Sequence, residues 1–338
     1  MKVYFAVAGM ILTVLTPADA MAQACGGPNP QGTTCGPFLG YAAADPSYGS
    51  ANSMPMQVAT VGLDLSDIQV EGPAIQTPDG DSDTIGLAAT LGKAGLQKLE
   101  RYDMHYQHAR RIGRGTRMRF LLDVPISVLH ADQFTLTTTY LGQTYDLGSF
   151  GGAGAVWGTL SAGLELPVSR SFTLTPRVNY TNLQADTYFG RGGERLGPSL
   201  SARYRLPQVG RGDLVLGAMV GYTHSLKTFL STQPFYASED FWTWRGGLAY
   251  QLPLKSRVFG RQSSLRASYV FTYMTGQPYM PYKKVHEVAI NLGVRTREAE
   301  TKGRFDQWRI GLIFTHTDNV FTREAGYNAG TLTLGSRF

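Results

Sequence analysis

The chain has 338 residues with 40 Gly, 18 Tyr, 16 Phe and 4 Trp, and 17% of its residues are charged. Beyond an N-terminal leader it contains no long apolar run, which argues against the closed apolar core of a soluble protein of this size. The formal net charge is +6. In an exported chain this indicates anionic lipid head groups or an anionic solute as partners, and no nucleic acid.

The leader has the three parts of a signal peptide. Lys2 precedes an apolar stretch over residues 3–15, and two small-residue cleavage sites follow, Ala18-Asp19-Ala20 and Ala22-Gln23-Ala24. A retained membrane anchor is the alternative, but a spanning helix needs roughly 20 apolar residues. We therefore expect residues 1–24 to be removed on export.

Two cysteines follow the leader. Cleavage after Ala24 leaves Cys25 at the mature N-terminus, so lipidation of this residue is one alternative, although Ala22 stands where a lipoprotein signal has Leu. Cys35 is the only other cysteine. Two cysteines close together in an exported chain predict a disulfide between Cys25 and Cys35.

Residues 25–97 are rich in Gly, Pro, Ala and Ser and show little periodicity, so we expect a mostly irregular segment that is periplasmic or plugs a lumen. Residues 84–97 are expected to form a short helix or an irregular strand. The acidic residues of this part are the candidates for a plug. They are Asp64, Asp67, Glu71, Asp79, Asp81 and Asp83.

From residue 98 to the end, apolar and polar residues alternate in segments of about ten residues that end in turn residues, which predicts β-strands. The segments are 102–106, 118–126, 134–140, 156–166, 172–180, 196–206, 214–222, 242–252, 265–273, 288–294, 308–314 and 332–338. Twelve is an even number, as single-chain bacterial membrane barrels require. Residues 98–338 are therefore expected to form the barrel domain.

A soluble β-sandwich would also alternate, but here aromatic residues stand near the strand ends, as in the girdles of membrane barrels. These residues are Tyr102, Tyr140, Tyr180, Tyr222, Trp242, Tyr273 and Trp308. The predicted fold class is all-β, a transmembrane antiparallel β-barrel of about twelve strands.

The connections predict the orientation, because periplasmic turns of such barrels are short. With both ends of the barrel in the periplasm, the short turns are 130–133, 167–171 and 207–212, whereas 255–263 and 296–303 depart from the rule by their length. Three strands on the same side end in Leu-Pro, which indicates a Pro-marked stop. They are Leu166-Pro167, Leu206-Pro207 and Leu252-Pro253.

The sequence offers only weak candidates for a set of catalytic residues. His224 and Ser225 are the nearest candidate for a hydrolase, but adjacent strand residues point to opposite faces. The same holds for the metal-like spacing of His105 and His108, and His316 has no Ser beside it. We expect no enzyme activity, no metal and no cofactor.

The predicted lumen is rich in arginine. Ten arginines stand at strand positions whose side chains are predicted to face the lumen, namely Arg101, Arg117, Arg119, Arg177, Arg203, Arg205, Arg245, Arg266, Arg309 and Arg337. Such positions carry four acids, namely Asp103, Asp123, Glu165 and Glu287. Arginines inside a pore favour small anionic solutes. Alternatively, the acidic segment 64–83 enters the lumen as a plug, or the arginines pair locally with barrel acids.

The last strand resembles the terminal strand of bacterial outer-membrane proteins. Leu332, Leu334 and Phe338 match its alternate apolar positions and terminal aromatic residue, while Ser336 departs from the pattern. The resemblance implies a location in the cell outer membrane and the barrel-assembly machinery and outer-membrane lipids as partners. Over residues 98–338 the chain resembles a solitary autotransporter-type barrel, although small-solute channels and an outer-membrane phospholipase share the strand count.

These observations leave three functions. The first is a narrow or plugged channel for small anionic solutes, and the second is a non-conducting barrel of the autotransporter type that serves export, assembly or surface interaction. The third is an outer-membrane hydrolase. The sequence does not identify the solute or the oligomeric state.

Overall fold

The computed structural model describes residues 81–94, 97–113, 117–131, 134–140, 143–150, 153–185, 192–229, 240–275, 282–294, 308–319 and 327–337. Over these ranges the chain forms antiparallel strands. Within this part of the chain, no helix is long and apolar enough to cross a membrane. The strands are β1 Ser82–Ala94, β2 Gln97–Arg111, β3 Arg119–Ala131, β4 Phe134–Tyr140, β5 Gln143–Phe150, β6 Ala153–Pro167, β7 Phe172–Ala185, β8 Gly192–Val209, β9 Gly212–Phe229, β10 Phe241–Val258, β11 Arg261–Thr275, β12 Tyr282–Val294, β13 Trp308–Asn319 and β14 Tyr327–Arg337.

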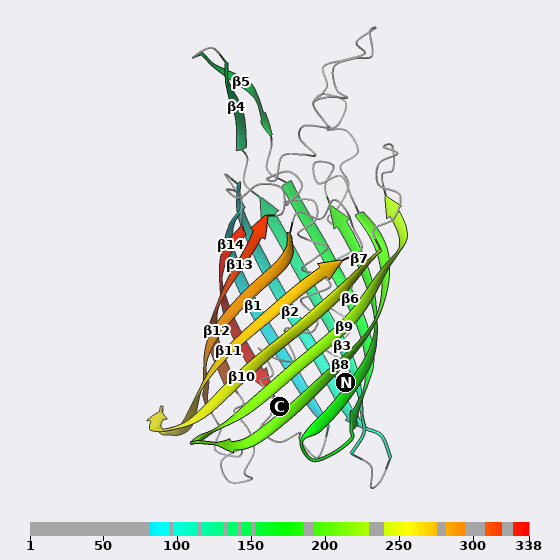
Figure 1. The fold of residues 1–338 in the computed structure, drawn as a ribbon, viewed down its shortest axis with the longest axis vertical. Coiled ribbons are helices and arrows are strands. Elements are labelled where there is room, and N and C mark those ends of the chain that lie inside the picture. Colours follow the sequence, from blue (N-terminus) through cyan, green and yellow to red (C-terminus); the bar gives the residue numbers. More distant parts are fainter. Residues whose placement is uncertain are drawn as a thin grey trace, which may run out of the picture. The chain divides into compact units, whose positions relative to one another are not determined.

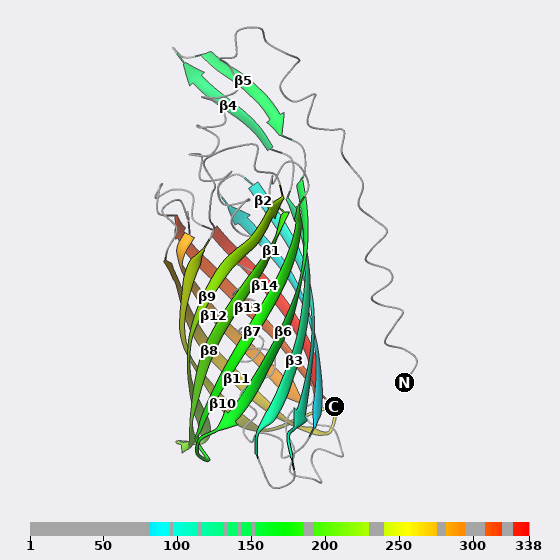
Figure 2. The ribbon, with the colours of Figure 1, turned by 90° about the vertical axis from the view of Figure 1, so that its right-hand side faces the viewer.

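Twelve of these strands form one closed antiparallel barrel, in which each strand pairs with its neighbours in the chain except where β4 and β5 intervene. The barrel closes where the first strand meets the last: β1 pairs with β14 from Thr84↔Arg337 to Ala94↔Tyr327. Figure 1 shows the cyan β1 alongside the red β14, and Figure 2 shows the closed wall from the side. Closure satisfies every strand edge within the wall, as a membrane barrel requires. The predicted fold class is confirmed.

The membership of the barrel differs from the prediction in two places, although the strand count is the same. β1 lies inside the segment 25–97, so the barrel begins at Ser82 and not at residue 98. Conversely, the predicted third strand, 134–140, is β4, which pairs with β5 in a two-stranded sheet of its own. The short turn predicted at 130–133 is therefore wrong, because the β4–β5 hairpin lies in the connection between β3 and β6.

The outward face of the barrel is apolar. Phe314 is 60% exposed, Ile290 54% and Leu332 52%, and they lie on three adjacent strands, β12 to β14. A water-soluble monomer rarely leaves so continuous an apolar surface open to solvent. Lipid chains are the environment that matches this face, so the barrel is a transmembrane one.

The aromatic girdle follows the prediction except at Tyr140, which lies on β4 and outside the barrel. Trp242 is 45% exposed on the outward face of β10, and its ring lies 5.0 Å from that of Tyr222 on β9. The Trp242 ring also stacks with Trp244 at 6.4 Å between centroids. Such rings, apolar in body and polar at one edge, favour the interface between lipid and water.

Two connections at one end of the barrel are tight two-residue turns, Gly210-Arg211 and Phe259-Gly260. Phe259 and Gly260 both have positive φ values, 51° and 73°. Two consecutive residues with positive φ match the right-handed twist of a hairpin. The long link predicted at 255–263 is therefore wrong. The Leu-Pro pairs at 206 and 252 mark the places where the pairing register shifts, and the strands continue beyond them.

Candidate functional site

The inward face of the barrel carries most of the predicted arginines. Their side chains alternate with outward residues along β2, β3, β7, β8, β10, β11 and β13. Buried arginines are Arg119, Arg177, Arg245, Arg266 and Arg309, and half-buried ones are Arg101, Arg203 and Arg205. Arg117 is a correction: it precedes β3 and is exposed, so it is not part of the barrel wall. The side chain of Arg337 lies outside the described part of the structure.

Strand boundaries explain the inward charges that sequence reasoning missed. Arg195 is 6% exposed on β8, which begins at Gly192 and therefore earlier than the predicted segment 196–206. Asp213 lies on β9 directly after the Gly210-Arg211 turn, and its Oδ2 accepts a hydrogen bond of 2.9 Å from Arg205 Nη2. Both residues share the inward phase of their strands, so extending each strand by a few residues would have found them.

Glu165 of β6 lies between two arginines. Its Oε2 accepts a hydrogen bond of 2.5 Å from Arg119 Nη2 on β3, the neighbouring strand. Its Oε1 lies 3.5 Å from Arg203 Nη2 on β8. The carboxylate therefore neutralises part of the positive charge of strands on both of its sides.

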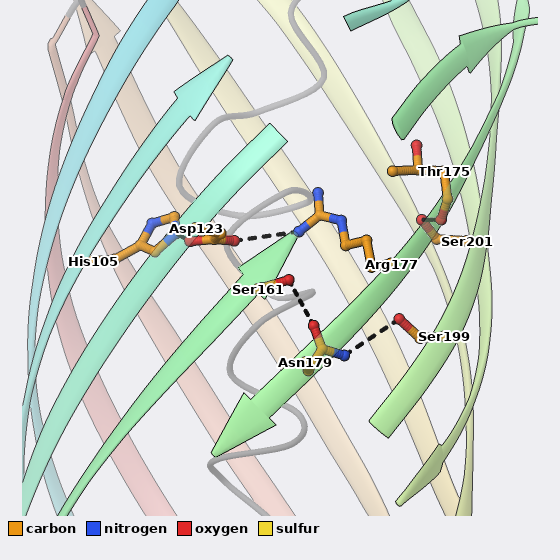
Figure 3. A network of polar contacts seen from close by, with 8 residues as sticks. All are labelled: His105, Asp123, Ser161, Thr175, Arg177, Asn179, Ser199 and Ser201. Carbon is orange, nitrogen blue, oxygen red and sulfur yellow. Dashed lines mark hydrogen bonds and ion pairs between the residues drawn. The ribbon is translucent and has the colours of Figure 1, made fainter. Parts of the chain in front are cut away.

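Asp123 of β3 also bridges two strands (Figure 3). Its Oδ1 contacts His105 Nε2 on β2, and its Oδ2 accepts a bond of 3.2 Å from Arg177 Nη1 on β7. All three residues are buried. Beside them, Ser161, Asn179 and Ser199 form a ladder of hydrogen bonds of 2.6 and 3.5 Å across β6, β7 and β8.

Arg177 reaches Asp123 across β6, and the absence of a side chain at Gly163 makes this possible. Gly163 pairs with Arg177 in the register of β6 and β7, and a Cβ atom added to it would lie 2.6 Å from Arg177 Cγ and 3.0 Å from the Pro176 carbonyl oxygen. Gly158 on the same strand has nothing within 4 Å of such an atom. Gly163 has the inward phase of β6 and Gly158 the outward phase, so only a side chain at 163 would crowd Arg177.

We expect Gly163→Ala to lower the free energy of unfolding by about 1–3 kcal/mol, because overpacking displaces Arg177 from Asp123. Gly158→Ala on the same strand should have an effect close to zero. Urea titrations of both variants in detergent, followed by tryptophan fluorescence, would measure the difference. Equal midpoints for the two variants would contradict the packing argument.

Three further inward arginines have carboxylate partners within the wall. Arg245 Nη2 donates to Glu287 Oε2 at 2.9 Å, with both side chains buried. Arg101 Nε donates to Asp103 Oδ2 at 2.8 Å two positions along β2. With Arg205, six predicted arginines pair with barrel acids: Arg101, Arg119, Arg177, Arg203, Arg205 and Arg245. Local pairing, one of the alternatives weighed above, accounts for these residues.

Two of the six plug candidates lie at the wall. Asp83 is on β1, where its Oδ1 accepts a 2.6 Å bond from the Tyr106 hydroxyl and lies 2.9 Å from His108 Nδ1. Asp81 directly precedes β1 and accepts a bond from the Arg111 amide at 2.9 Å. Asp81 and Asp83 are therefore not part of a plug. The other four candidates, Asp64, Asp67, Glu71 and Asp79, lie outside the described residues.

The inward face is not polar throughout. Phe241, Met274 and Val285 form a buried apolar cluster at the adjacent ends of β10, β11 and β12. The prediction placed apolar residues only on the outward phase. These three residues are inward by phase, and a hydrophobic constriction of a pore is built from side chains of this kind.

The histidines considered for chemistry lie on separate faces. His224 is exposed on β9, with Nδ1 3.0 Å from both Asp240 carboxylate oxygens, and the side chain of Ser225 lies outside the described part. His105 points inward and His108 outward, as expected from adjacent-face alternation. Among the described residues, no group of three His, Cys, Asp or Glu side chains converges on a possible metal position.

The terminal strand closes the barrel by pairing with β1. Leu332 and Leu334 are on the outward face, 52% and 42% exposed, and Ser336 pairs with Ile85 of β1. Phe338 and the cysteine pair Cys25 and Cys35 lie outside the described residues.

The chain was compared with known proteins. Its sequence matches no protein-family model and no curated protein. The translocator domain of autotransporter NalP from Neisseria meningitidis is similar in structure, with a TM-score of 0.53, 12% identity, and coverage of 86% of this chain and 99% of that one. The β domain of the Bordetella autotransporter BrkA has a TM-score of 0.47 and 10% identity, with coverage of 77% of this chain and 99% of that one. The KdgM porin has a TM-score of 0.37 and 10% identity, with coverage of 75% of this chain and 99% of that one. The similarity to the NalP translocator domain shows a shared fold, a closed antiparallel β-barrel.

Proposed function

We propose that this protein lies in the cell outer membrane and forms a narrow or plugged channel that favours small anionic solutes. The observation that carries the proposal is the excess of arginine over carboxylate on the inward face. The inward acids of the described strands are Asp103, Asp123, Glu165, Asp213 and Glu287, and each has an arginine partner. Arg195, Arg266 and Arg309 are further buried cations, so the inward face is net positive.

A narrow lumen is consistent with the burial of the inward side chains. Arg266 is 0% exposed and Asn291 1%, whereas the wide lumens of larger porins leave a water-filled channel. Asp64, Asp67, Glu71 and Asp79 remain our candidates for an acidic plug inside the net-positive lumen. Because β1 is part of the wall, a deletion that tests the plug must end before Ser82.

Planar-bilayer recordings test the proposal. The full-length mature protein should give small conductance steps, and a salt gradient should give a reversal potential of the sign for anion selectivity. A variant lacking residues 25–80 should give larger steps with the same sign. Cation selectivity would refute the channel for anions, and unchanged step size after the deletion would refute the plug.

The second candidate is a non-conducting barrel of the autotransporter type that serves export, assembly or surface interaction. The pairing of six inward arginines within the wall favours it, because paired charges stiffen a wall without requiring a permeating ion. The absence of any conductance from both the full chain and the 25–80 deletion would support this candidate over the channel.

A further inference from the structure

One part of the inward face has hydrogen-bond donors without acceptors. Arg266 lies near the middle of the inward face of β11 and is 0% exposed. In the strand register its neighbours are Gln251 of β10 and Asn291 of β12. Glu287, the inward carboxylate of β12, is already bonded to Arg245. The strands beside Arg266 therefore supply amides and hydroxyls but no available carboxylate.

The donors of this site have no acceptors in the part of the protein that the structure describes. Arg266 Nε, Nη1 and Nη2 and Asn291 Nδ2 are all buried without a hydrogen-bond partner there, as is the hydroxyl of Ser268, two positions along β11. Buried donors are almost always satisfied in native proteins. An uncompensated buried guanidinium is more costly still, so this arrangement calls for an anion.

The electrostatic surroundings strengthen the same demand. An anion at this position would be attracted by the Arg266 guanidinium, whose side chain is fully buried. Because Arg266 is desolvated, this attraction is less screened by water than at the surface.

Gly311 of β13 positions the second donor. It faces Asn291 in the register of β12 and β13, and an added Cβ atom would collide with Asn291 Oδ1 and lie 3.0 Å from Thr333 Oγ1. The Asn291 amide therefore occupies the space that a side chain at 311 would fill. The Asn291 side chain thus lies over Gly311 of β13, while Arg266 is its register partner on the other side, in β11.

We propose that Arg266 and Asn291 form a binding site for a small oxyanion, a carboxylate or phosphate group, on the inward face of β11 and β12. A guanidinium presents parallel N–H groups that match two oxygens of such a group. The inference deepens the proposed function, on which it rests for access of solutes to the lumen. It names the chemistry of the group that would be held there.

Thermal unfolding of the detergent-solubilised full chain, with inorganic phosphate or acetate added against chloride at constant ionic strength, tests the site. Both oxyanions should raise the unfolding midpoint in a saturable manner, because a ligand that binds only the folded state stabilises it. Arg266→Gln should weaken phosphate binding at least about tenfold, since a hydrogen bond to a charged group is lost. Arg257→Gln, at an exposed arginine of β10, should leave binding unchanged.

Two further variants should raise the unfolding midpoint, whereas a substitution that only damages the fold would lower it. Arg266→Met should raise the midpoint in oxyanion-free buffer and abolish the response, because it removes the uncompensated charge. Asn291→Asp, nearly the same in shape, should also raise the midpoint and abolish the response, because its carboxylate takes the place of the ligand. A lower midpoint for both variants, or a phosphate response that survives Arg266→Gln, would overturn the site.

The outcome is separable from the proposed channel. A barrel that responds to oxyanions through Arg266 but does not conduct would retain the site and refute the channel. A conducting, anion-selective barrel with no oxyanion response at Arg266 would retain the channel and refute the site.

Discussion

Deleting residues 25–97 should abolish the folded barrel, whereas deleting residues 25–80 should leave it intact. The first deletion removes β1, which pairs with β2 from Ser82↔Ala109 to Ala94↔Gln97 and closes the barrel against β14. Without it, β2 and β14 would each present an open edge to the hydrocarbon. Every unsatisfied backbone group there costs several kcal/mol.

Electrophoresis of heated and unheated samples checks this result, because folded membrane barrels migrate differently from unfolded ones. The 25–80 deletion should keep the shift in mobility and the β-type circular dichroism, and the 25–97 deletion should lose both. The 25–80 deletion is the matched control, since the two variants differ mainly by one strand. A heat-modifiable 25–97 deletion would show that the remaining strands close without β1.

Asp123→Asn should lower the free energy of unfolding by about 3–5 kcal/mol, because it breaks a buried ion pair by removing the charge of one partner. Asp123 is 1% exposed and is the shared partner of His105 and Arg177. The loss should therefore exceed that of a surface ion pair, which contributes about 0–1 kcal/mol.

A second substitution distinguishes lost charge balance from general damage. Adding Arg177→Met to Asp123→Asn should recover a large part of the stability, since the buried guanidinium that lost the Asp123 carboxylate is then removed as well. Asp103→Asn is the control, because its carboxylate is partly exposed and its partner Arg101 can reach solvent. Denaturant titrations in detergent measure all three variants. Failure of Arg177→Met to recover any stability would contradict the charge explanation.

The comparison of β1 with β4 shows the limit of reading strands locally. β1 has small inward residues such as Gly86 and Ala88, so its alternation of apolar and polar residues is weak, and the sequence suggested only a short helix or an irregular strand over 84–97. β4 alternates Phe and Leu with Thr as a barrel strand does, yet it pairs with β5 alone. Alternation shows that a segment can be a strand, but its partner depends on which edges remain unpaired.

For the inward arginines as well, alternation predicted which face they lie on, but their partners depend on the fold. Phase placed Arg119, Arg177 and Arg266 on the inward face correctly, because side chains alternate with period two. The alternation of side chains along a strand does not show their partners. Arg119 and Arg177 have acid partners, whereas Arg266 has none among the described residues. Arg177 and Asp123 are 54 residues apart, and their contact depends on an intervening glycine.

The sequence by itself determined the fold class, the phase of most strands and the outward positions of Leu332 and Leu334 on the C-terminal strand. These follow from a period-two pattern that is local in the chain and from the need to place apolar residues against lipid. The tertiary structure alone decided which strands enter the barrel, which inward charges are neutralised and where unsatisfied donors remain. These depend on register and closure, which bring together residues from strands distant in sequence.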